Sequence, residues 1–238
     1  AVKSELGKGI PMPLKHGKNL YKLKFDLPDA KLWDLETPYL YQLHAAVLVN
    51  GTCTDRLAQQ FGMRSFTQDT ESPQRKGMFY LNGRSIRLRG ANTMGFEQQD
   101  VLRGDLPQLI DDILLAKLCN MNFLRLTQRP VQDEVYEYCD KLGLMTQTDL
   151  PLFGVMRRFR VPEGIRQAEE LARMVRKHPC NVVVSYINEP FPNANNEPHR
   201  HLIRPELENF FACCDLVVKF SNPDQVIKHV DGDYDPPT

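Results

Sequence analysis

Two kinds of apolar segment alternate along the chain from residue 85 to residue 230. Short continuous apolar runs are typical of strands buried on both faces, and apolar residues three or four positions apart are typical of amphipathic helices. The predicted strands are 86–88, 123–126, 144–148, 182–187 and 225–230, and the predicted helices are 106–118, 133–142, 163–177 and 205–220. This alternation predicts an α/β fold with a parallel sheet and helical crossovers.

Two architectures fit this order of elements: a doubly wound open sheet and an eight-stranded barrel of parallel strands. No Gly-x-Gly-x-x-Gly sequence follows a predicted strand, which weakens the dinucleotide-binding version of the open sheet. Periodicity alone does not separate the two architectures, so both stay open at this point.

The first 75 residues have a different pattern, with short strand-like segments and no helical spacing. Segment 21–25 alternates with period two, segment 40–49 is rich in strand-forming residues, and segment 61–66 resumes the pattern. The sequence Asn50-Gly51-Thr52 fits a glycosylation acceptor, but Asn-Gly is also a good hairpin turn, and the turn needs nothing beyond the local sequence. We therefore predict part of a β-sandwich over 1–75, a linker at 69–76 and the α/β part over 76–238.

Composition excludes several classes of partner. The 238 residues carry 30 basic and 30 acidic side chains, so the formal net charge is zero, which argues against a nucleic-acid-binding surface. No apolar run approaches the roughly 18 residues of a membrane span. The six cysteines form no Cys-x-x-Cys pair and are interpreted as structural thiols. His199 and His201, near Glu197, have loose spacing in a segment rich in Asn and Pro, so we predict a loop there and no metal or cofactor.

Polar side chains follow the predicted strands, at the positions where barrel enzymes carry their chemistry. They are Arg89, Asn92 and Glu97 after the first strand, Thr127, Gln128 and Arg129 after the second, Asp149 after the third, and Asn188 and Glu189 after the fourth. The fourth set is the most informative, because a partly desolvated carboxylic acid can have a raised pKa and donate a proton. An alternative is that Glu189 merely caps the next segment.

Seven segments, in order between residues 20 and 190, are similar to those of glycoside hydrolase family 2, which includes β-galactosidases, β-glucuronidases and β-mannosidases. The segments are 32–41, ending Pro-Tyr-Leu-Tyr; 61–64, Phe-Gly-Met-Arg; 79–83 with 88–92; 120–125; 139–144; 177–179; and 185–189, Ser-Tyr-Ile-Asn-Glu. The resemblance implies the end of an immunoglobulin-like sandwich followed by the first five or so βα units of a TIM (β/α)8 barrel.

The resemblance also implies roles for individual residues. Glu189 matches the general acid/base of a retaining exo-acting β-glycosidase, and Asn188 matches the residue that contacts the sugar 2-hydroxyl. Arg125 matches an arginine that orients the nucleophile, with a purely structural ion pair as its alternative. Asn92, Asp149 and Gln128 complete the expected substrate-binding set. The implied partner is a β-glycoside, with no nucleic acid and no membrane.

The chain departs from the family pattern at a few positions. Gln128 and Met94 stand where many members have His, and Thr148-Asp149 stands for the usual Asp-Glu. The family's nucleophile lies on the seventh strand, which is expected beyond Thr238. We therefore expect an internal fragment of a larger enzyme, inactive by itself, whose partners include the parent's other domains. A non-catalytic carbohydrate-binding protein and an unrelated open-sheet enzyme remain alternatives, and oligomeric state, with a homo-oligomer as one option, and compartment stay open.

Overall fold

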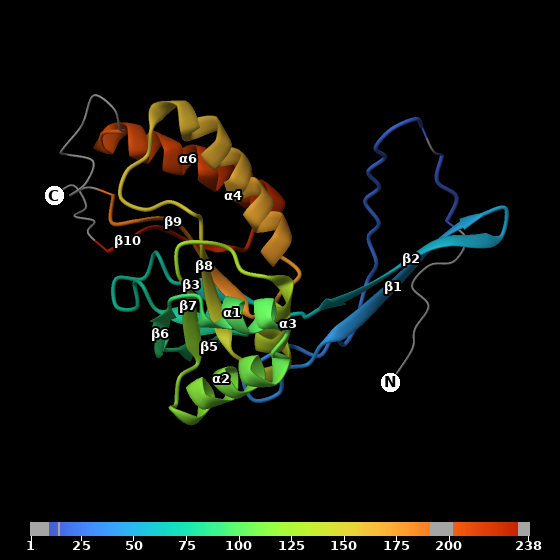
Figure 1. Cartoon of the computed structure of the whole chain (residues 1–238), viewed down its shortest axis with the longest axis horizontal. Coiled ribbons are helices and arrows are strands. Elements are labelled where there is room, and N and C mark those ends of the chain that lie inside the picture. Colours follow the sequence, from blue (N-terminus) through green and yellow to red (C-terminus); the bar gives the residue numbers. More distant parts are fainter. Residues whose placement is uncertain (1–9, 14, 191–201, 233–238) are drawn as a thin grey trace.

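The computed structural model describes residues 10–13, 15–190 and 202–232, and it is built around a sheet of five parallel strands. The strands are β6 (Gly90–Thr93), β7 (Phe123–Leu126), β8 (Met145–Asp149), β9 (Asn181–Asn188) and β10 (Val226–Asp231). Their order across the sheet is β10-β9-β8-β7-β6, so each strand pairs with the next one along the chain (Figure 1). A doubly wound sheet reverses its strand order at a switch point, and this sheet does not. The architecture is therefore the one that begins a barrel.

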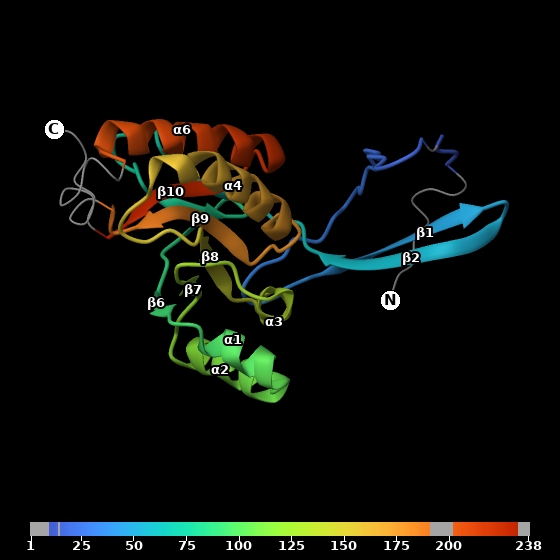
Figure 2. The same cartoon turned by 45° about the horizontal axis from the view of Figure 1, so that its top comes forward.

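The helices lie on the outer side of this sheet. They are α1 (Phe96–Arg103), α2 (Leu106–Leu118), α3 (Asp133–Leu142), α4 (Val161–Val175), which follows a short 3-10 turn at Arg158–Arg160, and α6 (Arg204–Ser221). Helices α4 and α6 lie side by side over β9 and β10 in both views (Figure 2). Parallel crossovers are right-handed, so strands added always in the same direction place their helices on the same face. Among the described residues, no helix is long and apolar enough to cross a membrane.

Strand β7 shows how the sheet separates the core from the functional face. Leu124 and Leu126 are buried, in the core between sheet and helices, whereas Phe123 and Arg125 line a cavity on the opposite face. Side chains alternate between the two faces of a strand, so the same four residues contribute both to the core and to the cavity.

Several elements confirm the predictions from sequence. Strand β7 and helix α3 have the predicted bounds, and α3 is capped by the following residue, Gly143, with φ 72°. Helix α2 also has the predicted bounds, and the Asp105 carboxylate accepts a hydrogen bond of 3.2 Å from the backbone N–H of Gln108. Each of these features depends on local sequence, such as a capping side chain or a left-handed glycine after a helix.

The prediction of the first parallel strand at 86–88 is wrong. Residues 84–86 form β5 (Arg84–Ile86) of an antiparallel hairpin, and the parallel strand β6 begins only at Gly90. The β6 sequence Gly-Ala-Asn-Thr lacks large apolar side chains, so it shows no strand periodicity. A Cβ at Gly90 would lie 1.7 Å from the carbonyl oxygen of Phe123, so close strand pairing requires glycine here. Asn92 consequently lies within the strand and not after it.

The N-terminal part consists of two antiparallel sheets. Strands β1 (Tyr41–Val49) and β2 (Thr52–Phe61) form a hairpin that projects away from the helices (Figure 2). Its turn, Asn50-Gly51, has φ values of 50° and 81°, as the hairpin prediction required. The predicted strands at 21–25 and 61–66 are wrong: the first has no strand partner, and the second contains only the last residue of β2 and the first of β3.

A three-stranded sheet crosses the predicted domain boundary near residue 75. Strand β3 (Phe66–Gln68) pairs with β4 (Phe79–Leu81), which in turn pairs with β5. The segment 69–76 therefore connects two paired strands, so backbone hydrogen bonds bridge the predicted boundary. The division at this residue stays a prediction.

Buried hydrogen bonds join the N-terminal part to the parallel sheet. The indole Nε1 of Trp33, which is fully buried, donates to the carbonyl oxygen of Asp140 over 2.8 Å. The Arg64 guanidinium donates to the carbonyl oxygens of Pro179 (3.0 Å) and Asn181 (2.7 Å). Side chains of the first 75 residues thus satisfy backbone groups at the start of β9 and the end of α3, which makes the two parts one packed unit.

The Lys117→Met variant is expected to lose about 1–3 kcal/mol of unfolding free energy. The Lys117 ammonium donates to the carbonyl oxygens of Leu35 (2.8 Å), Leu142 (2.6 Å) and Gly143 (3.1 Å), and Met keeps most of the aliphatic stem without a donor. Urea denaturation measures the loss. Lys141→Met is the control, because that ammonium lies 3.6 Å from Glu137 on the helix surface. Equal losses in the two variants would contradict a role for Lys117 at this junction.

Candidate active site

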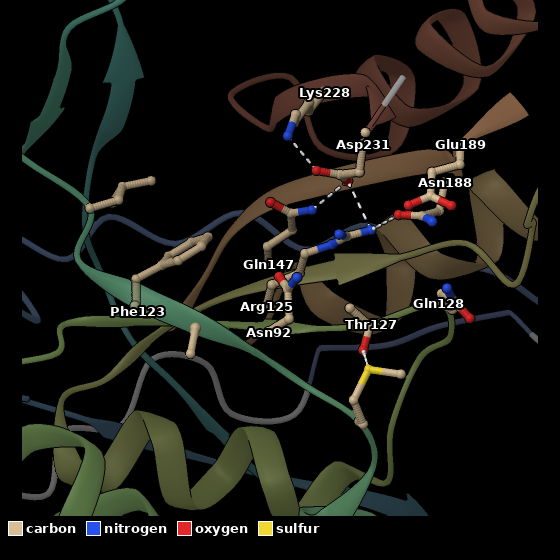
Figure 3. A pocket seen from close by; sticks show the side chains of 15 residues that line it. Asn92, Phe123, Arg125, Thr127, Gln128, Gln147, Asn188, Glu189, Lys228 and Asp231 are labelled. Atoms are coloured by element: carbon tan, nitrogen blue, oxygen red, sulfur yellow. Dashed lines mark hydrogen bonds and ion pairs between the residues drawn. The ribbon is translucent and has the colours of Figure 1, made fainter. Parts of the chain in front are cut away.

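A cavity of about 830 Å³ lies on the inner face of the parallel sheet (Figure 3). Its walls come from all five strands or the residues next to them. The lining residues are Leu88, Gly90, Ala91, Asn92, Met94, Phe123, Arg125, Thr127, Gln128, Gln147, Asn188, Glu189, Lys228, Asp231 and Gly232. The structure therefore brings together five of the six predicted site residues in one cavity. The sixth, Asp149, does not line the cavity but accepts hydrogen bonds from Arg125, which does.

Arg125 is the centre of the polar network in this cavity. Its Nε and Nη2 atoms donate to the Oδ2 atom of Asp149 over 3.0 and 2.6 Å. The same Nη2 donates to the Oδ1 atom of Asn188 over 2.8 Å and lies 3.4 Å from the Oδ2 atom of Asp231. One guanidinium thus connects the ends of β7, β8, β9 and β10, and Figure 3 shows its contacts with Asn188 and Asp231.

Three residues of this network were not singled out as site residues from the sequence. The Gln147 side-chain amide donates to Asp149 (2.9 Å) and to Asp231 (2.7 Å), and the Lys228 ammonium pairs with Asp231. A signal for Gln147 was present, because it lies two positions before Asp149 in a strand and so shares its face. Nothing local connects Asp231 with Gln147, since 84 residues separate them.

The charges of the network are balanced, and they are mostly buried apart from Lys228, whose side chain is 53% exposed. Arg125 and Lys228 face Asp149 and Asp231, and the Asp149 side chain is only 3% exposed. Burial is the largest influence on Asp149 and raises its pKa, against hydrogen bonds from Arg125, Gln147 and the backbone N–H of Gln128, which lower it. The site therefore keeps a carboxylate whose desolvation is only partly compensated.

Unusual backbone conformations occur at two residues of the cavity. Among the described residues, six non-glycine residues have positive φ, and four are Asn or Asp in turns, residue types that tolerate this region. The other two are Gln128 (φ 65°) and Glu189 (φ 49°), which follow β7 and β9. Longer side chains are rare in this conformation, and such strain is concentrated at functional sites.

Glu189 and Asn188 have different surroundings despite being neighbours. The Asn188 side chain is buried and its Oδ1 atom accepts from Arg125, which leaves the Nδ2 group oriented as a donor. Glu189 is exposed at the end of β9 and borders the cavity. Its backbone N–H donates to the carbonyl oxygen of Asp231 over 2.8 Å, which holds the end of β9 against β10.

Two other polar residues named from the sequence, Arg89 and Glu97, do not line the cavity, whereas Thr127 does. The Arg89 side chain donates to the carbonyl oxygen of Asn120 (3.0 Å), near the start of β7. Glu97 is buried in α1 and does not line the cavity, and burial raises its pKa. These residues were misplaced because the first strand was predicted too early in the sequence.

The described residues contain no cluster of metal-ligating side chains. Within 10–13, 15–190 and 202–232, no three His, Cys, Asp or Glu side chains gather as metal ligands would. The predicted loop with His199, His201 and Glu197 lies outside the described residues. All six cysteines are free thiols, and burial raises the pKa of Cys139, Cys180 and Cys214.

The fold and site together define a protein of barrel-type βα units with a charged, hydrogen-bonded site at the carboxyl ends of its strands. Residues 74–206 match the model of the TIM barrel domain of glycosyl hydrolases family 2, and residues 3–64 match a second model of this family. The chain belongs to glycosyl hydrolases family 2.

Curated relatives and solved structures agree with this assignment. The chain is 28% identical over 193 residues to a beta-galactosidase of Erwinia tasmaniensis and 28% identical over 180 residues to a beta-glucuronidase of Mus musculus. These alignments cover 76% and 70% of this chain, but only 18% and 26% of the relatives. The crystal structure of a Bacteroides uniformis beta-glucuronidase has the same fold, with a TM-score of 0.66, 24% identity, and coverage of 83% of this chain and 24% of that one.

Proposed function

We propose that this chain supplies the acid/base half of the active site of a retaining exo-acting β-glycosidase, with Glu189 as general acid/base. The observation that carries the proposal is the position of Glu189, exposed at the end of β9 on the rim of the cavity. There a protonated carboxyl can protonate the leaving oxygen of a glycoside, and the resulting carboxylate can then activate water.

Asn188 and Arg125 support the proposal by their geometry. The oxygen of the Asn188 amide accepts a hydrogen bond from Arg125, so the Nδ2 group is available to donate to a sugar hydroxyl beside Glu189. Asn92 and Gln128 extend the polar wall of the cavity and are proposed to contact the sugar. Asp149 acts indirectly, by holding Arg125 and the backbone N–H of Gln128, the latter over 3.0 Å.

The nucleophile is proposed to lie on a later strand, beyond residue 238. Retention needs a second carboxyl group about 5–5.5 Å from the acid/base, with a lone pair free to attack the sugar. Asp149 and Asp231 are poor candidates, because their oxygens already accept hydrogen bonds from Arg125, Gln147 and Lys228. A barrel has eight strands and the described residues form five, so three further strands would complete the site.

The N-terminal hairpin is proposed to belong to an immunoglobulin-like sandwich. The match of residues 3–64 to a family model supports this domain, and so do apolar side chains that the hairpin exposes. These are Leu43, Val47, Leu48, Val49 and Leu57, each more than 40% exposed. A second sheet would bury them, as sandwiches do.

A second candidate function is carbohydrate binding without hydrolysis. Met94 and Gln128 line the cavity at positions where the family resemblance leads us to expect histidines, so part of the usual chemistry is absent. This alternative predicts a sugar complex without turnover.

Assays with aryl β-glycosides test the proposed function. A protein that carries this chain with a complete barrel is expected to release the aryl group, and NMR of the first-formed sugar is expected to show the β-anomer. The 238-residue chain by itself is expected to give no turnover, because the five described parallel strands leave two open edges and the proposed nucleophile lies on a later strand. Turnover by the chain alone, or an α-anomer as first product, would contradict the proposal, and binding without release would favour the alternative.

A further inference from the structure

Gly232 touches the side chain proposed as the acid/base. It follows the last residue of β10, lines the cavity and has φ 83°. A Cβ atom built on Gly232 would lie 2.6 Å from Cγ of Glu189, 3.5 Å from its Oε1 and 3.6 Å from its Cδ. Carbon atoms do not approach to 2.6 Å without displacement, so the Glu189 side chain occupies space that exists only because residue 232 has no side chain.

The backbone on both sides of this contact is also constrained. The Glu189 N–H donates to the carbonyl oxygen of Asp231, directly before Gly232, and Asp231 pairs with Asn188 in the parallel register. Glu189 has the left-handed conformation (φ 49°), which is unfavourable for a residue of its type. The end of β10 therefore supports a strained residue at the end of β9 by a hydrogen bond on one side and a steric gap on the other.

We propose that Gly232 is a positioning residue for Glu189, and that the end of β10 sets the direction in which the acid/base carboxyl points. This inference rests on the proposed function of Glu189 and goes beyond it, because it assigns the orientation of the carboxyl to another strand. A side chain at residue 232 would turn the carboxyl away from the glycosidic oxygen. General acid catalysis depends on a proton placed within hydrogen-bond reach.

Gly232→Ala in the complete enzyme is the test variant, and Gly77→Ala is its control. Gly77 has φ 88° and nothing within 4 Å of a built Cβ, so its substitution causes the same backbone strain without the contact. For Gly232→Ala, kcat/KM for glycosides with poor leaving groups is expected to fall by up to about 10²-fold, as for a catalytic group displaced by about 1 Å. Activated aryl glycosides, which need little protonation, are expected to change much less, and Gly77→Ala is expected to behave as wild type on both.

The dependence of kcat/KM on the leaving group is compared among the variants. If this dependence is steep in Glu189→Gln but no steeper in Gly232→Ala than in Gly77→Ala, the inference is overturned. If Glu189→Gln lowers kcat/KM equally for all leaving groups, the proposed function is overturned. The contact between Gly232 and Glu189 is then tested by thermal stability. For that purpose each glycine substitution is repeated with Glu189→Ala. The thermal midpoint of Gly232→Ala is expected to lie below that of Gly77→Ala, and the difference is expected to vanish without the Glu189 side chain.

The combination of Gly232→Ala with Glu189→Ala also tests the inference when the single variant folds poorly. Should Gly232→Ala fail to fold, the double variant with Glu189→Ala is expected to fold, because removal of Cγ removes the clash. A difference in midpoint that persists in the Glu189→Ala background would overturn the steric basis of the inference.

Discussion

Replacing Glu189 by Gln in the complete enzyme is expected to lower kcat/KM for aryl β-glycosides with poor leaving groups by about 10²–10⁴-fold, the usual contribution of a general acid. Glutamine keeps the shape of the side chain but has no acidic proton, so the departing oxygen must leave as an anion. Glycosides with strongly acidic phenols leave readily without protonation and are expected to retain most of their rate in the first step. A plot of log kcat/KM against the pKa of the leaving group measures the difference.

Glu134→Gln is the matched control for this experiment. Glu134 is exposed in the first turn of α3 and does not line the cavity, so its replacement by Gln is expected to leave the plot unchanged. If Glu189→Gln slows activated and unactivated substrates equally, Glu189 does not donate the proton. That result would favour a role in binding or in the local fold.

Arg125→Met is expected to cost about 3–5 kcal/mol of unfolding free energy at neutral pH, the usual effect of removing one partner from a buried ion pair. The Arg125 and Asp149 side chains are 12% and 3% exposed, so solvent screens their ion pair only weakly. The variant leaves Asp149 and Asp231 without their shared cation, although Lys228 still pairs with Asp231. Urea denaturation measures the loss, with Arg166→Met as the control, since Arg166 pairs with Glu163 and Glu170 on an exposed helix face.

The deficit of Arg125→Met is expected to shrink as the pH falls. Burial already raises the folded-state pKa of Asp149 above its ordinary value of 3.8, and loss of the Arg125 hydrogen bonds raises it further. A carboxyl whose pKa is higher in the folded than in the unfolded state binds protons more tightly when folded. Stability therefore increases as the pH falls through the folded-state pKa and is lost as the pH rises through it. A deficit that stays constant or grows over the whole range from pH 7 down to the ordinary pKa of 3.8 would show that the unpaired Asp149 is not its cause.

The site was predicted from the sequence only in part. Asn188, Glu189, Asn92 and Gln128 were named because functional residues follow strands and most of the strands were visible from their apolar runs, whereas Arg125 was named from the family resemblance. The partners of these residues were not found. Asp231 joins Arg125 through the pairing of β9 with β10, and Gly232 reaches Glu189 through the same pairing.

Local sequence by itself determined helices α2 and α3, strand β7 and the Asn50-Gly51 turn, because capping side chains, left-handed glycines and periodicity act over a few residues. It also determined which side chains stand at the ends of β7, β8 and β9. Only the tertiary structure decided that β6 begins at Gly90, that five strands add in one direction, and that Gln128 and Glu189 take strained conformations. These features depend on strand register and on contacts between residues far apart in the chain, where close packing and buried charge, and not local preference, control the free energy.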